Sequence, residues 1–207
     1  MTTHNDGAPS NDSARDRLLR VAYDLFCRFG IRPVGVDTVV AEANVAKKTL
    51  YRHFPSKNDL IVTVLRRREE LWTRAWLQRE VTERGHTPAE RLLAIFDVFG
   101  EWFARDDFEG CTFINALVEF EDEAHPVHQA SVRHLANIRD FLGELAADAG
   151  ADDPDSFARQ WHVLMKGSII AAMEGDQDSG RRAREMGALL LEHRVIASRM
   201  PGEGGVA

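Results

Sequence analysis

One short stretch of the sequence gathers side chains that can donate hydrogen bonds to phosphates and to the edges of bases. They are Lys47, Lys48, Thr49, Tyr51, Arg52 and His53. Cationic side chains attract the phosphate backbone of a nucleic acid, and hydroxyl, guanidinium and imidazole groups can also read base edges. The stretch therefore predicts a surface that contacts nucleic acid, provided that one helix presents these groups on its exposed side.

The apolar residues around this stretch predict two short helices joined by a tight turn. Those at helical spacing before the turn are Val36, Val39, Val40 and Ala43. After the turn, Leu50 and Phe54 lie one helical turn apart, so both can face a core while their polar neighbours face outward. Asn44 stands at the reversal, and asparagine tolerates left-handed backbone better than most residues. This is the layout of a helix-turn-helix, whose second helix enters the DNA major groove.

The same segments resemble the DNA-binding domain of the tetracycline-repressor (TetR) family of bacterial regulators. The matching segments are LLRVAYDLFCRFG (18–30), VVAEANV (39–45) and TLYRHFPSK (49–57). Val40 and Asn44 depart from the family pattern, which usually has Ala and Gly there. The resemblance implies an all-α, homodimeric transcription regulator. It also implies a repressor that binds a palindromic DNA operator and is released by a small-molecule effector.

The resemblance assigns DNA contacts to two groups of residues. We expect base edges or nearby phosphates to be reached by Lys47, Lys48, Thr49 and Tyr51. We expect the DNA backbone to be held by Thr38, Arg52, His53 and Lys57. Lys57 lies in the first turn of a predicted helix, where backbone N–H groups also favour phosphate.

The distribution of charge agrees with a DNA-binding N-terminus. The whole chain has 207 residues and a net charge of −7, which by itself argues against a nucleic-acid partner. Residues 1–74 carry 13 Lys and Arg against 9 Asp and Glu, a balance of +4, whereas the remainder carries 13 against 24, a balance of −11. A basic N-terminal segment followed by an acidic remainder fits a protein whose N-terminal part contacts DNA.

The remaining pattern is helical throughout and predicts an N-terminal three-helix domain followed by a larger helical domain. Ser13 with Asp16, Ser56 with Asp59, and Thr87 with Glu90 look like helix starts. The expected first helix buries Leu18, Ala22, Leu25 and Phe29 and ends at Gly30. Further helices are expected from 57 to the low 80s, from 88, over 111–123, 125–150, 154–175 and 181–199. The expected domains are 13–56 and 57–200, with disordered tails at 1–12 and 201–207.

Aromatic residues on the predicted helices of the second domain suggest a cavity for an apolar or aromatic small molecule. Such a cavity needs apolar walls and a few inward polar groups, of which Lys166 is one candidate. The other candidate ligand contacts are Trp72, Trp76, Phe99, Trp102, Phe103, Asn115, Glu119, His128, Trp161, His162 and Met165. For most of these aromatic residues, however, plain core packing is the favoured interpretation.

The last two predicted helices carry more apolar surface than a terminal hairpin needs. The residues concerned are Leu164, Ile169, Ile170, Met173, Met186, Leu189, Leu190, His193 and Ile196. In the family the resemblance points to, such helices pack against their counterparts in a second subunit. A homodimer also agrees with the few base pairs that one recognition helix can read.

Other functional classes find less support in the sequence. No nucleotide-binding loop, HExxH motif or nucleophile motif is present, so an enzyme is not expected. Glu119, Glu121, His125 and His128 lie close together, but Pro126 interrupts the run, and a metal-responsive sensor stays an alternative. A constitutive DNA-binding protein without an inducer is the other alternative.

The sequence also predicts the cellular setting. The two cysteines, Cys27 and Cys111, are expected to be reduced core thiols, and no cofactor is expected. Neither a signal peptide nor an apolar run long enough for a membrane span is visible, so we expect a cytoplasmic protein.

Overall fold

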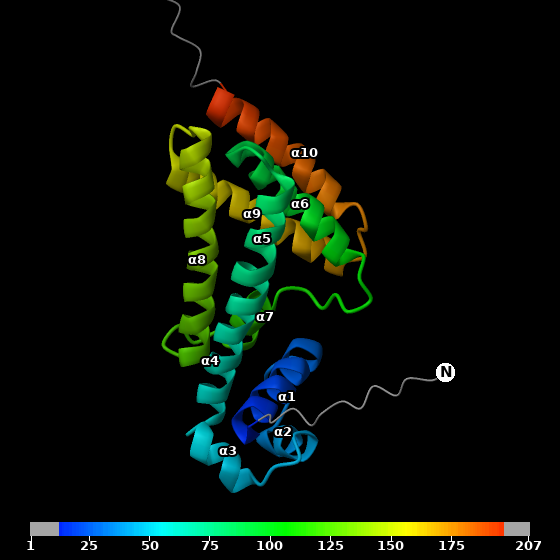
Figure 1. Ribbon diagram of the computed structural model, residues 1–207, viewed down its shortest axis with the longest axis vertical. Coiled ribbons are helices and arrows are strands. Elements are labelled where there is room, and N and C mark those ends of the chain that lie inside the picture. The colour runs from blue at the N-terminus through cyan, green and yellow to red at the C-terminus, as the bar shows by residue number, and fades with distance from the viewer. Residues whose placement is uncertain (1–12, 197–207) are drawn as a thin grey trace, which may run out of the picture. The chain divides into compact units, whose positions relative to one another are not determined.

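The structure, a computed structural model, describes residues 13–196, and these residues form helices joined by turns and loops, without a β-strand (Figure 1). The predicted tails lie outside the described residues. The chain divides into two compact units, with the boundary after Val64. The first unit thus includes Leu60, Ile61 and Val64, which are buried and follow the domain boundary expected after residue 56.

The first unit contains α1 (Ala14–Phe29), α2 (Val36–Glu42), α3 (Lys47–His53) and the start of α4 (Lys57–Arg68). Ser13 caps α1 by accepting a hydrogen bond from the backbone N–H of Asp16, and Gly30 ends it with φ of 81°, as predicted. The buried side of α1 is rotated from the predicted one. It consists of Leu18, Leu19, Ala22 and Phe26. Phe29 is 55% exposed, because the helix ends at this residue and the inward spacing runs through Phe26.

The second unit is a bundle of helices that begins within α4 (Figure 1). It continues through η1 (Glu69–Leu77), α5 (Gln78–Arg84), α6 (Pro88–Phe103), α7 (Thr112–Glu119), α8 (Pro126–Ala149), α9 (Pro154–Met173), α10 (Ser179–Leu191) and η2 (Glu192–Ile196). Helix α6 contacts α5, α8, α9 and α10, while α9 packs between α8 and α10. This arrangement makes α6 and α9 the centre of the core.

Several predicted helix boundaries in this unit are confirmed. Thr87 and Glu90 form a reciprocal capping box at the start of α6. Helix α8 ends at Gly150, whose φ of 86° places it in the left-handed region that glycine adopts without strain. The helix expected to run to residue 123 ends at Glu119 instead, because α7 stops at Phe120 and His125 caps a new helix. The last predicted helix begins at Ser179, and residues 197–199 of that prediction lie outside the described range.

The helical stretch from Lys57 to Arg84 is continuous, but its middle part, η1, is a π-helix. Glu69, the first residue of η1, is buried, and its carboxylate accepts hydrogen bonds from Asn137 at 2.8 Å and Arg74 at 3.3 Å. It also contacts the ring of His134 on α8. Burial acts to raise the pKa of Glu69, but the bond from Asn137 and the charges nearby outweigh it and lower the pKa. This ionised carboxylate therefore fixes η1 against α8.

Helices α6 and α10 approach each other closely at a pair of glycines. A Cβ atom added to Gly180 would lie 3.0 Å from the backbone of Gly100 and from the carbonyl oxygen of Phe96. Gly187, two turns further along α10, faces Trp161 and Phe96 in the same way. The absence of side chains at these positions lets α10 cover the core of the unit.

Candidate nucleic-acid interface and internal cavity

The turn between α2 and α3 has the geometry that the sequence predicts. Asn44 has φ of 51°, in the left-handed region, and is the only non-glycine residue with positive φ among those described. The chain reverses through hydrogen bonds from the N–H of Ala43 to Val39 O (2.9 Å) and from the N–H of Val45 to Val40 O (3.1 Å). The asparagine thus supplies the backbone conformation for which the TetR pattern usually has glycine.

The inward side of this motif is closed by apolar side chains. Val39, Leu50 and Phe54 are 1%, 0% and 2% exposed, which confirms the inward role predicted for Leu50 and Phe54. The guanidinium of Arg15 lies over the ring of Phe54, 5.4 Å from its centre. Because α3 has only seven residues, this packing, rather than intrinsic helix propensity, holds it in place.

The outward side of α3 carries the predicted hydrogen-bond donors. Lys47, Lys48, Tyr51 and Arg52 are exposed, and Thr38 is exposed at the start of α2. Thr49 and His53 are half-buried at the edges of this face. The structure therefore brings these residues onto one helix and its neighbour, while their contacts with DNA stay a prediction.

Two of the predicted lysines have partners within the protein. The ammonium of Lys47 lies 2.7 Å from a carboxylate oxygen of Asp37, at the start of α2. The Lys57 ammonium donates to the carbonyl oxygens of Ile31 (2.9 Å) and Arg32 (3.4 Å). Lys57 thus ties the start of α4 to the turn after α1, a role that the sequence did not reveal.

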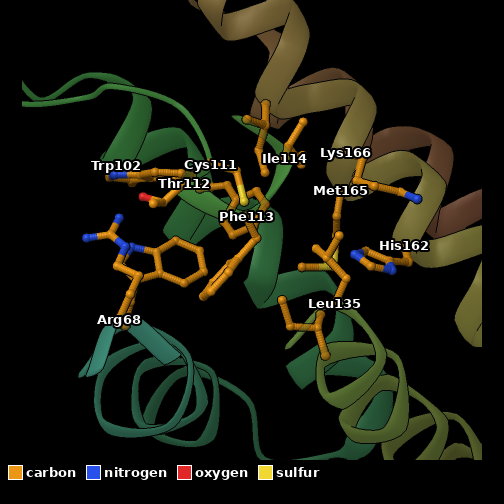
Figure 2. A pocket seen from close by; sticks show the side chains of 14 residues that line it. Arg68, Trp102, Cys111, Thr112, Phe113, Ile114, Leu135, His162, Met165 and Lys166 are labelled. Carbon is orange, nitrogen blue, oxygen red and sulfur yellow. The ribbon is translucent and has the colours of Figure 1, made fainter. Parts of the chain in front are cut away.

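The second unit contains a cavity lined by residues from α4, η1, α6, α7, α8 and α9 and by the residue before α7 (Figure 2). The lining residues are Arg68, Trp72, Phe99, Trp102, Cys111, Thr112, Phe113, Ile114, Leu135, Ile138, His162, Met165, Lys166 and Ile169. The cavity volume open to the centre of a water molecule is about 20 Å³. That is room for about one water molecule, so the side chains nearly fill the cavity.

Five of the predicted ligand contacts line this cavity. They are Trp72, Phe99, Trp102, His162 and Met165. Lys166, predicted as an inward polar group, lines it as well. These side chains come from helices far apart in the sequence, so their convergence is a result of the fold.

The other six predicted contacts do not line the cavity. Trp161 is fully buried between Phe96 and Phe157, with ring centres 5.2 and 5.3 Å away, and serves the core. Phe103 packs on Trp102, and Trp76 borders a neighbouring hollow. Asn115, Glu119 and His128 lie outside the lining. Their helices present Phe113, Thr112 and Leu135 to the cavity instead.

Apart from Phe113, one stretch of the cavity wall was not expected from the sequence. Cys111, Thr112, Phe113 and Ile114 line the cavity from one consecutive segment around the start of α7. Cys111 is half-buried and precedes α7, so it is not the core helix residue that was expected. The composition of this apolar segment was the available signal, but only a tertiary arrangement shows which of its residues face the cavity.

The predicted dimer residues divide into exposed and covered side chains. Ile170, Met173, Met186 and Leu189 are 41%, 50%, 57% and 66% exposed, and His193 is exposed as well. Leu164 and Leu190 are half-buried. Ile169 is 4% exposed and lines the cavity, so it is already covered within the chain. The side chain of Ile196 lies outside the described part.

The two histidines considered for a metal site, His125 and His128, serve local structure. The ring of His125 stacks on Phe120 and accepts a hydrogen bond from the N–H of Val127. Nδ1 of His128 lies 2.7 Å from the carbonyl oxygen of Phe120, so it carries the proton. Within residues 13–196, no three His, Cys, Asp or Glu side chains are grouped in a way that could hold a metal ion.

A helix-turn-helix whose second helix exposes hydrogen-bond donors is typical of a DNA-binding regulator of transcription. Two sequence models of known families match this chain and identify the family within that class. The sequence model described as bacterial regulatory proteins of the tetR family matches residues 18–64. A second model, the C-terminal domain of tetracyclin-repressor-like proteins, matches residues 88–186. The chain belongs to the TetR family of transcriptional regulators.

Similar proteins cover both units. The HTH-type transcriptional regulator YjdC of Escherichia coli is 25% identical over 83% of this chain and 91% of its own length. The transcriptional regulator AcuR of Cereibacter sphaeroides is 27% identical over 80% of this chain and 79% of its own. The crystal structure of SCO4454, a TetR-family regulator from Streptomyces coelicolor, has a TM-score of 0.77 and 31% identity, covering 88% of this chain and 96% of that one.

In the part of the chain that the structure describes, no helix combines the length and apolar character that a bilayer crossing requires.

Proposed function

We propose that this protein is a repressor that binds a palindromic DNA operator as a homodimer and leaves it when a small apolar or aromatic molecule enters the cavity. The observation that supports this most directly is the pairing of two features in one chain. One is the exposed donor face of α3, and the other is the apolar cavity of the second unit. DNA binding follows from the family, whereas repression and release are the proposal.

The dimer is supported by apolar side chains on α9 and α10. Ile170 and Met173 on α9, with Met186 and Leu189 on α10, are large and at least 41% exposed. Because α9 and α10 pack against each other, their exposed residues can form one interface, and two copies would bury it as a four-helix contact. A dimer doubles the number of base pairs read and explains why a palindrome is expected.

The tight packing of the cavity supports the release step. A ligand larger than a water molecule must displace lining side chains, among them Trp72, which lies on η1. A ligand lowers DNA affinity only if it binds the displaced conformation better. A coupling free energy of about 1–3 kcal/mol would reduce operator affinity about 5- to 150-fold.

The test begins with selection of bound sequences from a random DNA pool, which should give a palindrome. Compounds that quench tryptophan fluorescence are then added to the operator complex and should release it. If cavity binders are found and none changes operator affinity, the release mechanism fails and a constitutive DNA-binding protein becomes the better account.

The dimer has its own test. Replacing Met186 and Leu189 with Asp places charges in the proposed interface, so the variant should be a monomer in sedimentation and lose tight operator binding. Val132→Asp is the control, because Val132 is 44% exposed on α8 and should tolerate the charge as a dimer. If the variant were a folded monomer with full operator affinity, the proposal that a dimer binds the operator would be contradicted.

A further inference from the structure

The charge of the cavity wall is opposite to the charge of the unit that contains it. Residues 65–207 carry a balance of −9, as 17 Lys and Arg stand against 26 Asp and Glu. Nevertheless, the residues that line the cavity include Arg68 and Lys166 and no carboxylate. A cation on an otherwise apolar wall interacts strongly with an anion, because the surrounding dielectric is low.

Lys166 is the cation that most needs such a partner. It is half-buried on α9, and within the described part of the chain it makes no hydrogen bond or ion pair. Two exposed arginines of the same unit differ in this respect. Arg105 pairs with Asp107 and Arg159 pairs with Asp155. Figure 2 shows this side chain at the edge of the cavity, with its ammonium directed away from Trp102 and Phe113. An ammonium without an ion-pair partner at the edge of an apolar cavity can bind a ligand anion.

His162 adds a second polar group at the same end of the cavity. It lies one helical turn before Lys166, and both come from α9 on one side of the cavity (Figure 2). The ring is 3% exposed, and its Nδ1 is buried without a hydrogen-bond partner. Burial lowers the pKa of His162 to about 3, and the charge of Lys166 acts in the same direction, so the ring is neutral. A neutral imidazole can donate one hydrogen bond to an anion that Lys166 attracts.

Aromatic rings form the other side of the cavity, where they can hold an apolar body. Trp72 contacts Phe99 and Trp102, with ring centres 5.9 and 4.8 Å apart. The guanidinium of Arg68 lies over Trp72 at 5.6 Å. Arg68, Trp72 and Trp102 also border a neighbouring hollow that contains the Arg105–Asp107 pair. The charge of Arg68 thus has a carboxylate in its surroundings.

We infer that the cavity binds a small carboxylic acid with an apolar or aromatic body, whose carboxylate lies at Lys166 and His162 and whose body packs on Trp72, Phe99 and Trp102. This inference rests on the proposed effector cavity and narrows its ligand from apolar molecules in general to organic anions. The ammonium and the imidazole replace the water lost by the carboxylate, while the rings take up the hydrocarbon.

The test compares acids with neutral amides of nearly the same shape. Benzoate with benzamide, and hexanoate with hexanamide, are titrated into the DNA-free protein and followed by tryptophan fluorescence and calorimetry. In the wild type, each acid should bind about tenfold or more tightly than its amide, since a charge-assisted hydrogen bond contributes more than a neutral one. In Lys166→Met the preference should vanish, with amide affinity unchanged, whereas Lys166→Arg should retain it. Arg159→Gln, on the exposed side of the same helix, is the matched control.

Three results would overturn the inference. These are equal affinity for acid and amide in the wild type, a preference that survives Lys166→Met, and no binding of either acid at millimolar concentration. Operator assays keep this result separate from the proposed function. If neutral compounds release DNA and acids do not bind, only the inference that the ligand is an anion is refuted. If acids bind with the expected preference and DNA stays bound, the site stands and the release step is refuted.

Discussion

The two units of this protein place their chemistry in opposite environments. In the first unit, the polar donors lie on the water-exposed side of α3, and its short inward side holds the helix in place. In the second unit, the polar groups His162 and Lys166 line an interior cavity that is otherwise largely apolar. A change on α3 therefore removes contacts without disturbing a core, whereas a change in the cavity alters binding and folding together.

The largest expected effect is a loss of operator affinity when exposed side chains of α3 are removed. Replacing Lys48 and Tyr51 with Ala removes two exposed side chains of α3, and a base contact contributes about 1–3 kcal/mol. Operator affinity, measured by fluorescence anisotropy, should fall roughly 30-fold or more. The free energy of unfolding and the binding of cavity ligands should remain those of the wild type. Wild-type affinity in this variant would mean that α3 is not the recognition helix.

The second prediction concerns how the free energy of unfolding depends on pH through the buried residue His162. His162 stays neutral when folded because its pKa is about 3, against an ordinary value of 6.5. Below pH 6.5 the unfolded chain binds a proton that the folded chain does not, so stability falls as the pH drops from 6.5 toward 3. Between pH 7 and 5 this residue should cost about 2 kcal/mol.

Denaturant unfolding at both pH values and one fixed protein concentration measures this loss. His162→Gln should be less stable at pH 7 but should lose correspondingly less stability at pH 5. His134, whose pKa is also lowered, chiefly by burial, is present in both proteins and cancels in the comparison. Equal losses in the two proteins would show that His162 is protonated when folded.

The third prediction tests how tightly the second unit is packed. Gly180→Ala would push a methyl group against the backbone of α6 at 3.0 Å, so it should lower the free energy of unfolding by about 1–3 kcal/mol. Gly143→Ala is the matched control, because nothing lies within 4 Å of its added Cβ on α8. That change should be neutral or stabilise by up to about 1 kcal/mol, through helix propensity. If both substitutions lowered the free energy of unfolding, or both raised it, the close approach of α6 and α10 would not explain the effect of Gly180→Ala.

The smallest expected effect is a change in operator affinity when the exposed pair of Asp37 and Lys47 is broken. Asp37 holds the ammonium of Lys47 at 2.7 Å and raises its pKa, first through their hydrogen bond. Asp37→Asn would free Lys47 and remove a negative charge next to the donor face. Operator affinity should rise a few-fold, and the dependence of its logarithm on salt should steepen by about one unit. Asp24→Asn, an exposed change on α1, should leave both quantities nearly unchanged.

The surface site could be predicted from the sequence because its positions depend on local rules. Asn44 at the turn and Leu50 and Phe54 on the inward side follow from backbone preference and helical spacing over a few residues. The helix caps at Ser13 and Thr87 were predicted for the same reason. Where a local rule leaves two faces open, prediction failed, as it did for the buried side of α1.

The cavity could be predicted only in part because it depends on the pairing of distant helices. Trp102 and Trp161 carry the same apolar periodicity, yet one borders the cavity and the other is enclosed by Phe96 and Phe157. Spacing identifies both as buried and gives no means of telling them apart. Ile169 was assigned to a subunit interface for the same reason, since an apolar helix position does not show which neighbour covers it.

The nearly filled cavity also has a consequence for dose. On the proposed function, the conformation that admits a ligand is a minor one, and the apparent dissociation constant equals the intrinsic one divided by the populated fraction. The concentration at which the regulator responds would then be set by how firmly Trp72, Met165 and their neighbours pack, as well as by contacts with the ligand. Substitutions that loosen this packing would adjust the response threshold of the regulated genes without touching either binding surface.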